Sequence, residues 1–194
     1  KGPVGYLSLS VGSHHTCVSQ VFFGGRCWGR NDFGQLGVGD TNNRGDQPGE
    51  MGATLPAAPP GLLVALAEAT CGDPMQSGNY SCWGFGGDGI FGNGSPANIG
   101  DEPNEAPVPI GNQYFPAEYR QGLHRCDFNF TGCWGRNTFG QLGHDSLENY
   151  GNDPGETIPS PPLVVGPGQF AAVGRSHTCS TSTPFVCWGG NDKG

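Results

Sequence analysis

Basic residues are scarce in this sequence. Nine lysines and arginines stand against 17 aspartates and glutamates in 194 residues, and the formal net charge is −8. Nucleic-acid binding needs a dense basic surface to match the phosphate backbone, which this composition does not supply. We therefore expect no nucleic acid among the partners, whereas cationic partners are compatible with the charge.

Long apolar runs and helical patterns are also missing. The longest mainly apolar run, 61–67, is too short to span a bilayer, so no membrane span is expected. No window has apolar residues sustained at helical spacing, and 36 glycines and 17 prolines oppose helix interiors. Because these residues separate short apolar and aromatic runs, they indicate turns between strands. The sequence predicts an all-β, turn-rich protein.

The first residues lack two further features. The sequence opens on Lys1-Gly2-Pro3, with no initiating methionine and no signal peptide. We therefore expect either a processed form or a part of a longer chain.

An internal repeat runs through the whole sequence. Its stretch 30–37, Arg-Asn-Asp-Phe-Gly-Gln-Leu-Gly, returns almost unchanged at 136–143 and as a weaker copy at 85–92. Upstream of these, 11–17 matches 173–179 around the tripeptide His-Thr-Cys. Agreement this extended establishes a repeat of just over 50 residues. Cys-Trp-Gly occurs once in each copy, and the tryptophans are 55, 51 and 54 residues apart: Trp28, Trp83, Trp134 and Trp188.

A repeat of this length with His-Thr-Cys, Cys-Trp-Gly-Arg-Asn and Phe-Gly-Gln-Leu-Gly resembles the regulator-of-chromosome-condensation repeat family. The resemblance covers essentially the whole chain. It implies a β-propeller, typically of about seven blades, each a small sheet of about four strands with one of the tryptophans in its core. We expect an all-β fold of propeller-type blades of short antiparallel strands, about three and a half repeats, stapled by disulfides.

The repeat count does not close a propeller. We expect repeats at 5–60, 61–115 and 116–167, followed by the first half of a fourth at 168–194. The fourth is then truncated, or completed by a neighbouring chain, or the blades run on as an open array. A repeat leaves apolar faces that only a neighbour can bury, so we expect both open ends to bind partners.

All eight cysteines lie in the repeat register, two in each copy. Because the same two blade positions recur, one set of disulfides is favoured over the many other pairings. Four regular pairs predict an oxidising compartment, and with it an extracellular or cell-surface location. The expected pairs are Cys17 with Cys27, Cys71 with Cys82, Cys126 with Cys133, and Cys179 with Cys187.

Zinc is the alternative for these cysteines, because His15, His124 and His177 each precede one by two residues. The pairs lack Cys-x-x-Cys spacing, and the second repeat has Ala69 where the histidine should stand. We therefore expect no metal, and histidines that are packed or hydrogen-bonded inside the propeller.

Three sequons predict N-glycosylation at Asn79, Asn93 and Asn129. Asn79 and Asn129 both lie between the paired cysteines of their repeats, so they map to the same hairpin in successive blades. The alternative is that these asparagines are simply polar turn residues.

No catalytic residue is expected. Carboxylates recur in every repeat, as in 46–50, 101–105 and 153–156, and this repetition indicates a turn device rather than a single active site. A faint calcium-loop pattern at 40–46 has Arg44 where a ligand is needed. Once the cysteines are paired, no nucleophile with a neighbouring base is left. We expect a non-enzymatic protein without a cofactor.

Two functions agree with these features. The first is an extracellular structural or adhesive repeat glycoprotein, such as a building block of a fibre or cell-surface assembly, which self-associates through open repeat ends or binds other extracellular proteins or glycans. The alternative is a secreted, inhibitor-like propeller module that recognises a protein or glycan. A nuclear exchange factor, the namesake activity of the family, is disfavoured by the acidic charge, the paired cysteines and the sequons.

Overall fold

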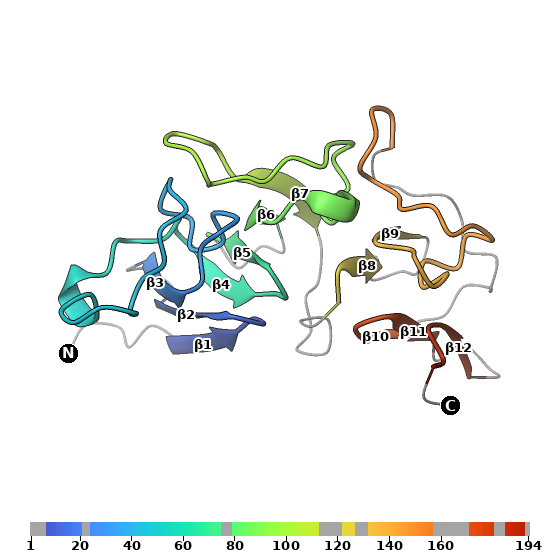
Figure 1. The fold of residues 1–194 in the computed structure, drawn as a ribbon, viewed down its shortest axis with the longest axis horizontal. Helices are drawn as coiled ribbons and strands as arrows, with labels where there is room; N and C mark the ends of the chain where they lie inside the picture. The colour runs from blue at the N-terminus through green and yellow to red at the C-terminus, as the bar shows by residue number, and fades with distance from the viewer. Residues whose placement is uncertain are drawn as a thin grey trace. The chain divides into compact units, whose positions relative to one another are not determined.

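The computed structural model describes residues 7–20, 24–74, 79–112, 122–126, 132–156, 171–180 and 185–192 (Figure 1). Two short 3-10 helices, η1 (Gly52–Thr54) and η2 (Gly87–Gly89), lie in the loops between strands. The strands are β1 (Leu7–Val11), β2 (His15–Gln20), β3 (Gly24–Gly29), β4 (Leu62–Ala65), β5 (Ala69–Asp73), β6 (Asn79–Gly84), β7 (Val108–Asn112), β8 (His124–Cys126), β9 (Cys133–Gly135), β10 (Ala171–Val173), β11 (His177–Ser180) and β12 (Val186–Gly189).

The strands form four small antiparallel sheets, one for each repeat, in which neighbours in sequence are neighbours in space. The sheets are β1-β2-β3, β4-β5-β6-β7, β8-β9 and β10-β11-β12. This confirms the predicted all-β class. The four strands that the family resemblance implies are complete in the second sheet, and the described residues supply three, two and three strands to the first, third and fourth.

Four disulfides staple the sheets, and no cysteine is free. Each bond joins two cysteines that lie directly opposite on adjacent strands, as Cys17 on β2 faces Cys27 on β3. The Cα–Cα separations are 4.0–4.1 Å, close to those of non-hydrogen-bonded pairs, where side chains approach most closely. Such short loops add roughly 2–3 kcal/mol each in the chain-entropy account. The other bonds are Cys71–Cys82, Cys126–Cys133 and Cys179–Cys187.

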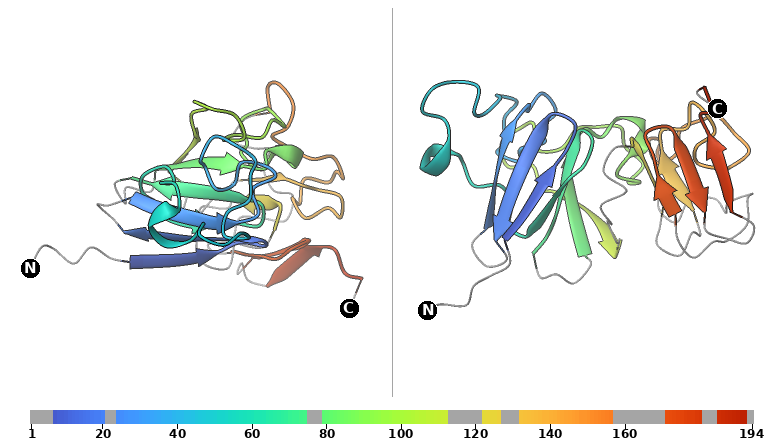
Figure 2. Two further views of the ribbon diagram at one scale, coloured as in Figure 1. Left: turned by 60° about the vertical axis from the view of Figure 1, so that its left-hand side comes forward. Right: turned by 90° about the horizontal axis from the view of Figure 1, so that it is seen from below.

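The chain divides into two compact units. Unit 1 comprises Lys1–Phe85 and Asn98–Asn112, and unit 2 comprises Gly86–Ala97 and Gln113–Gly194. This grouping cuts across the repeats, because the loop that carries η2 belongs to the second repeat in sequence but packs with the third. Within unit 1 the sheets β1–β3 and β4–β7 lie side by side (Figure 2).

Each unit has its own apolar core built around a disulfide. In unit 1 the buried Cys17 and Cys27 pack with Leu63, Ala65 and Trp83 of the next repeat. In unit 2 Cys126 and Cys133 pack with Leu142, Val173 and the partly buried Trp188. The disulfides therefore have two roles: they link adjacent strands within a sheet, and they form part of the apolar core between neighbouring repeats. In the part of the chain that the structure describes, no helix is long and apolar enough to cross a membrane.

Candidate functional site

Neighbouring repeats meet through two different faces of their sheets. Because side chains alternate along a strand, each sheet has two different faces, and within a unit one of them is turned toward the repeat that follows and the other toward the repeat that precedes. We call these the trailing face and the leading face. In unit 1 the trailing face of the first repeat consists of Ser10, His15, Cys17, Ser19 and Cys27. The leading face of the second repeat consists of Leu63, Ala65, Thr70 and Trp83.

A chain of hydrogen bonds joins these two faces. The Thr70 hydroxyl donates to the backbone carbonyl of Gln35 at 2.7 Å, and the Trp83 indole Nε1 donates to the same carbonyl at 3.2 Å. The distance from His15 Nε2 to Thr70 Oγ1 is 2.8 Å. The hydroxyl of Thr70 has a single proton, which it uses in the hydrogen bond to the Gln35 carbonyl. His15 must therefore donate from Nε2, so its neutral ring carries the proton on Nε2. Buried and mutually polarised, these bonds hold the two repeats in one register.

The same arrangement recurs in unit 2. Thr178 and Trp188 donate to the carbonyl of Gln141 at 2.8 and 3.0 Å, and the ring of His124 lies 2.8 Å from the Thr178 hydroxyl. The tryptophan bond alone recurs a third time, where Trp134 donates to the carbonyl of Ile90 at 3.1 Å. Ile90 occupies the repeat position of Gln35 and Gln141. The acceptor is backbone, so the side chain at this position is free to vary.

Burial of the two interface histidines keeps them neutral. Burial first, and then the charge of His14, lower the pKa of His15 from 6.5 to about 4. Burial, then the charges of Arg125 and His177, lower the pKa of His124 to about 3. These two rings are packed and hydrogen-bonded as predicted. For His177 the expectation was wrong, because its ring is exposed in the structure.

Two repeat faces are left uncovered by the residues that the structure describes. On the leading face of the first repeat Leu9 is 63% exposed and Val11 56% exposed. Next to them Trp28 is half-buried, and no acceptor for its indole lies among the described residues. On the trailing face of the fourth repeat His177 and Cys187 are exposed and line a pocket of about 690 Å³. These residues occupy the repeat positions of the buried interface residues described above.

A recurring carboxylate closes the long loop of three repeats. Oε2 of Glu105 accepts from the backbone N–H of Gly100 and of Glu102, at 2.7 and 3.1 Å. Glu50 and Glu156 accept from the corresponding N–H groups of their own loops. In Glu105 burial of the carboxyl opposes ionisation, but these backbone bonds outweigh it and lower the pKa. The repeated acidic motif is therefore a turn device, as its repetition predicts.

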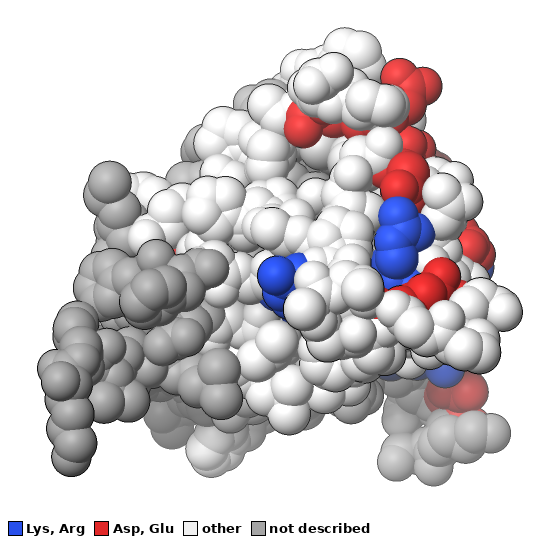
Figure 3. All heavy atoms as spheres, turned by 90° about the vertical axis from the view of Figure 1, so that its left-hand side faces the viewer, with Lys and Arg blue, Asp and Glu red and all other residues white. Residues whose placement is uncertain are grey.

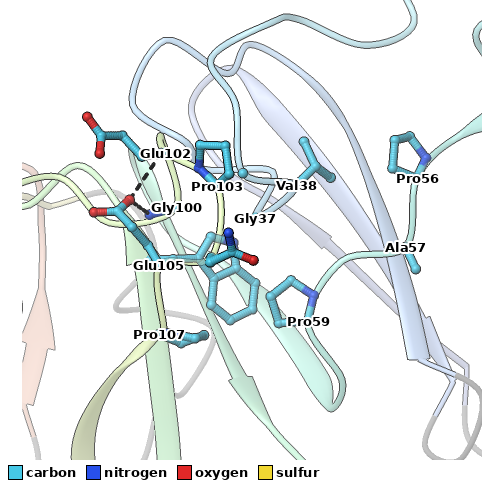
Figure 4. A pocket seen from close by; sticks show the side chains of 13 residues that line it. Gly37, Val38, Pro56, Ala57, Pro59, Gly100, Glu102, Pro103, Glu105 and Pro107 are labelled. Carbon is cyan, nitrogen blue, oxygen red and sulfur yellow. Dashed lines mark hydrogen bonds between the residues drawn. The ribbon is translucent and has the colours of Figure 1, made fainter.

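One loop of this kind helps to form a pocket of about 470 Å³ in unit 1, which we call the loop pocket (Figure 4). Its walls carry Val38, Pro56, Pro59, Pro103 and Pro107, with Trp83 at the base, and its charged residues are Glu102 and Glu105. Figure 4 shows Val38 and Pro103 on facing segments of the rim, with Pro59 opposite Pro107. This pocket combines apolar walls with negative charge, a combination that no sequence motif had indicated.

The sequons lie in different surroundings. Asn79 is exposed at the start of β6, and Asn129 lies outside the described residues. Asn93 is half-buried, and its Oδ1 accepts from the backbone N–H of Ser95 at 3.3 Å. Arg44, from the faint calcium-loop pattern, pairs with Asp40 at 2.6 Å, so a cation already occupies that carboxylate.

No family model matches the sequence. The structure is similar to that of human WBSCR16, with a TM-score of 0.60 and 21% identity over 94% of this chain and 47% of that one. Yeast RCC1 (Prp20) bound to Kap60 gives a TM-score of 0.54 and 21% identity, over 95% and 43% of the two chains. A second structure of Prp20p from Saccharomyces cerevisiae, studied for its binding to Gsp1p and histones, gives 0.55 and 13%, over 97% and 46%.

The chain has an RCC1-like fold. This confirms the fold that its repeat motifs imply. The chain spans a little under half the length of these proteins. At 21% identity or less, the similarity describes the arrangement of the strands and carries no function with it.

Proposed function

We propose that this protein is a non-enzymatic extracellular repeat protein that binds a second copy of itself head to tail through its uncovered repeat faces. One observation carries the proposal: the two faces are the two halves of an interface that the molecule already contains. Leu9, Val11 and Thr16 correspond to Leu63, Ala65 and Thr70, which the first repeat covers.

The opposite face supplies the matching half. His177 and Cys187 correspond to His15 and Cys27. A second copy would let the His177 ring donate to Thr16, as His15 donates to Thr70. Phe185 is 81% exposed and occupies the repeat position of Gly25. The contact between two copies must therefore pack differently from the internal one at this position, and it buries additional apolar area.

The expected free energies indicate that this head-to-tail contact is weak. Burying Leu9, Val11 and Phe185 contributes about 1.5–3 kcal/mol each, and one neutral hydrogen bond adds about 1 kcal/mol. Association itself costs at least about 4 kcal/mol, and often more. We therefore expect assembly that grows with protein concentration. Because a head-to-tail contact that does not close generates a filament, elongated oligomers are expected.

An extracellular location is supported by the disulfides and the sequons. Four cross-strand bonds are typical of oxidising compartments. Asn79 is exposed at the start of its strand, where a glycan can be attached. The absence of enzymatic activity is supported by the structural roles of the reactive groups: the cysteines are bonded, and His15 and His124 are buried with low pKa values.

Sedimentation velocity over a hundredfold concentration range tests the proposal, with disulfide-bonded protein from a secretory host. Leu9→Glu places a charge on the leading face and should weaken association at least about tenfold. Leu147→Glu is the matched control, because Leu147 is 66% exposed in a loop of unit 2 and belongs to neither uncovered face. A monodisperse monomer throughout, or equal effects of the two substitutions, would overturn self-association.

The second candidate is a binding module that recognises another protein or a glycan. The loop pocket favours it, because a concave site with apolar walls and a few polar groups is the usual form of a binding site. Yeast Prp20, which has a similar fold, forms a complex with Kap60, and this also supports a protein partner. A chain that stays monomeric in sedimentation and still binds a partner saturably at the loop pocket would favour this function over the first.

A further inference from the structure

We propose that the loop pocket of unit 1 binds the cationic side chain of a partner peptide, an arginine or a lysine, with its stem along the proline walls and its charged end toward the carboxylates of Glu102 and Glu105 at the outer edge of the loop (Figure 4). The inference rests on the second of the two functions proposed above and is independent of head-to-tail binding. It names the chemical class of the ligand, which neither the repeat motifs nor the fold supply.

The apolar part of the pocket suits the stem of such a side chain. Pro56 and Pro59 come from the connector that leaves the first repeat, and Pro103 and Pro107 come from the loop of the second repeat. Proline rings have a fixed φ, so these walls keep their shape without a ligand. Lysine and arginine bury their methylene stems along such surfaces while the charged end reaches polar groups. The three or four methylenes of an arginine or lysine stem can therefore pack along these walls, and the walls lose little conformational entropy when they do.

The base of the pocket is rigid as well. Trp83 is 1% exposed, and its indole is bonded to the Gln35 carbonyl. Gly37 lies so close to the indole that a Cβ there would be 2.5 Å from Nε1. The pocket is preorganised, which reduces the free energy spent on ordering when a ligand binds.

The charged part of the pocket is negative and not neutralised within it. Oε2 of Glu105 accepts from two backbone N–H groups, and the Asp101 side chain also lies within hydrogen-bonding reach of this carboxyl, which keeps lone pairs with which to accept from a ligand. Glu102 is exposed on the same loop, and no lysine or arginine is among the lining residues. The backbone bonds that lower the pKa of Glu105 keep it charged down to acidic pH. Figure 3 shows acidic side chains along one edge of another view of the molecule, with basic side chains among them.

A bare divalent cation fits the pocket less well than an organic cation. Calcium takes six to eight oxygen ligands, whereas the pocket offers two carboxylates, one of them already bonded to the backbone. In the described part of the chain no three acidic, histidine or cysteine side chains converge as a metal site. The proline walls would contribute nothing to a metal, but they would contact an alkyl stem.

Two peptides of equal size and shape test the inference: acetyl-Gly-Leu-Arg-Leu-Gly-amide and the same peptide with citrulline in place of arginine. Each is titrated into the whole disulfide-bonded chain labelled with 15N, and amide shifts are followed with calorimetry alongside. The arginine peptide should shift the amides of residues 37–39 and 100–105 in a saturable way. The citrulline peptide should bind at least about fivefold more weakly, because it has the same contacts without the charge.

Three variants locate the site. Glu102→Gln should weaken the arginine peptide about three- to fivefold, because it removes one rim charge and touches no hydrogen bond of the loop. Ala57→Trp should abolish binding, since an indole at this exposed rim position fills the pocket. Glu148→Gln, the same charge change at an exposed site in unit 2, should leave the affinity unchanged. Unaltered amide spectra away from the pocket show that each variant is folded.

The outcomes separate this inference from the function on which it rests. If both peptides bind equally at residues 37–39 and 100–105, the cation preference is overturned, while a binding module remains. If neither peptide shifts these amides, or if Glu148→Gln weakens binding as much as Glu102→Gln, the site itself is overturned. If calcium chloride alone produces the same saturable shifts, the ligand is a metal ion and the inference is wrong.

Discussion

His15 and Thr70 lie 55 residues apart in the sequence, and their side chains meet at 2.8 Å across the interface between two repeats. The histidine donates a hydrogen bond from Nε2 to the threonine hydroxyl, and the hydroxyl donates a hydrogen bond to the carbonyl of Gln35. His124 and Thr178 repeat this relationship in unit 2. Burial disfavours the charged form of each imidazole, so the cohesion of neighbouring repeats depends on pH.

Stability should fall as the pH drops below about 6.5. The pKa values of His15 and His124 are lowered to about 4 and about 3 in the folded chain, whereas the unfolded chain protonates both near the ordinary value of 6.5. Their contribution is therefore complete above pH 6.5, and acid removes it progressively down to about pH 4 for His15 and pH 3 for His124. Each of these two histidines takes up about one proton on unfolding between about pH 4 and pH 6.5, which adds about 1.4 kcal/mol per pH unit to the slope, and His144, whose pKa burial also lowers, acts in the same direction. Urea unfolding at pH 4.5–7.5 measures it.

A matched pair of substitutions assigns the slope to the interface. His124→Gln should remove the uptake of about one proton on unfolding, so the slope of unfolding free energy against pH should fall by roughly 1.4 kcal/mol per pH unit. His177→Gln removes an exposed ring at the same repeat position, and its charge is a smaller cause of the lowered pKa of His124 than burial is, so the slope should change far less than in His124→Gln. Equal slopes for all three proteins would contradict the role given to buried histidines. Glu50 and Glu105 have lowered pKa values, so their protonation affects the stability at more acidic pH than that of the histidines.

The indole of Trp83 should contribute more to stability than that of Trp28. Trp83→Phe removes the bond to the Gln35 carbonyl and leaves a smaller ring in a site that is 1% exposed. The expected cost is about 2–3 kcal/mol. Trp28 has the same repeat position but is half-buried with no indole acceptor among the described residues, so Trp28→Phe should cost less than about 1 kcal/mol. Far-UV circular dichroism in urea, without reductant, compares them. Similar losses would show that the shared carbonyl is not what holds the repeats together.

Much of the fold could be predicted from the repeat alone. Two cysteines at constant positions in each copy indicate a cross-strand pair, and the structure has these four bonds. The all-β class follows from glycine and proline between short apolar runs. A local pattern suffices here because each sheet forms from strands that are neighbours in sequence.

The contacts between repeats could not be predicted in the same way. Gln35 recurs as Gln141, which draws attention to its side chain, yet the partner of each interface tryptophan is the backbone carbonyl of this position. The side chain of Ile90 departs from the motif, but its backbone carbonyl still accepts a hydrogen bond from the Trp134 indole. The loop pocket was missed for a related reason. Its two walls are 44 or more residues apart in sequence, as between Pro59 and Pro103, and only the packing of two repeats brings them together.

Alanine at Gly37 should be far more disruptive than alanine at Gly49. Both glycines have positive φ, +69° and +88°, so any side chain costs about 1 kcal/mol in backbone strain. At Gly49 no atom lies within 4 Å of the added Cβ, and the cost should end there. At Gly37 the Cβ would come within 2.5 Å of Trp83 Nε1 and 2.6 Å of Pro59 Cδ, so these buried groups must move. We expect a loss of at least about 3 kcal/mol for Gly37→Ala. Equal urea midpoints for the two variants would exclude this close approach.

The disulfide of the fourth repeat should be the first to yield to a reductant. Thiol attack requires access to sulfur. Cys187 is exposed and Cys179 half-buried, whereas Cys17 and Cys27 are 0% and 1% exposed beneath the second repeat. Brief treatment with low concentrations of dithiothreitol, followed by alkylation and peptide mass spectrometry, should therefore label Cys179 and Cys187 before any other pair.

Concentration provides the control for this last prediction. If second copies cover the trailing face of the fourth repeat, Cys187 becomes protected as the protein concentration rises, and Leu9→Glu removes that protection. The bond between Cys17 and Cys27 should stay slow to reduce at every concentration, because its cover belongs to the same chain. Simultaneous labelling of all four pairs would instead mean that reduction follows global unfolding, and that the exposure of Cys187 does not govern its reactivity.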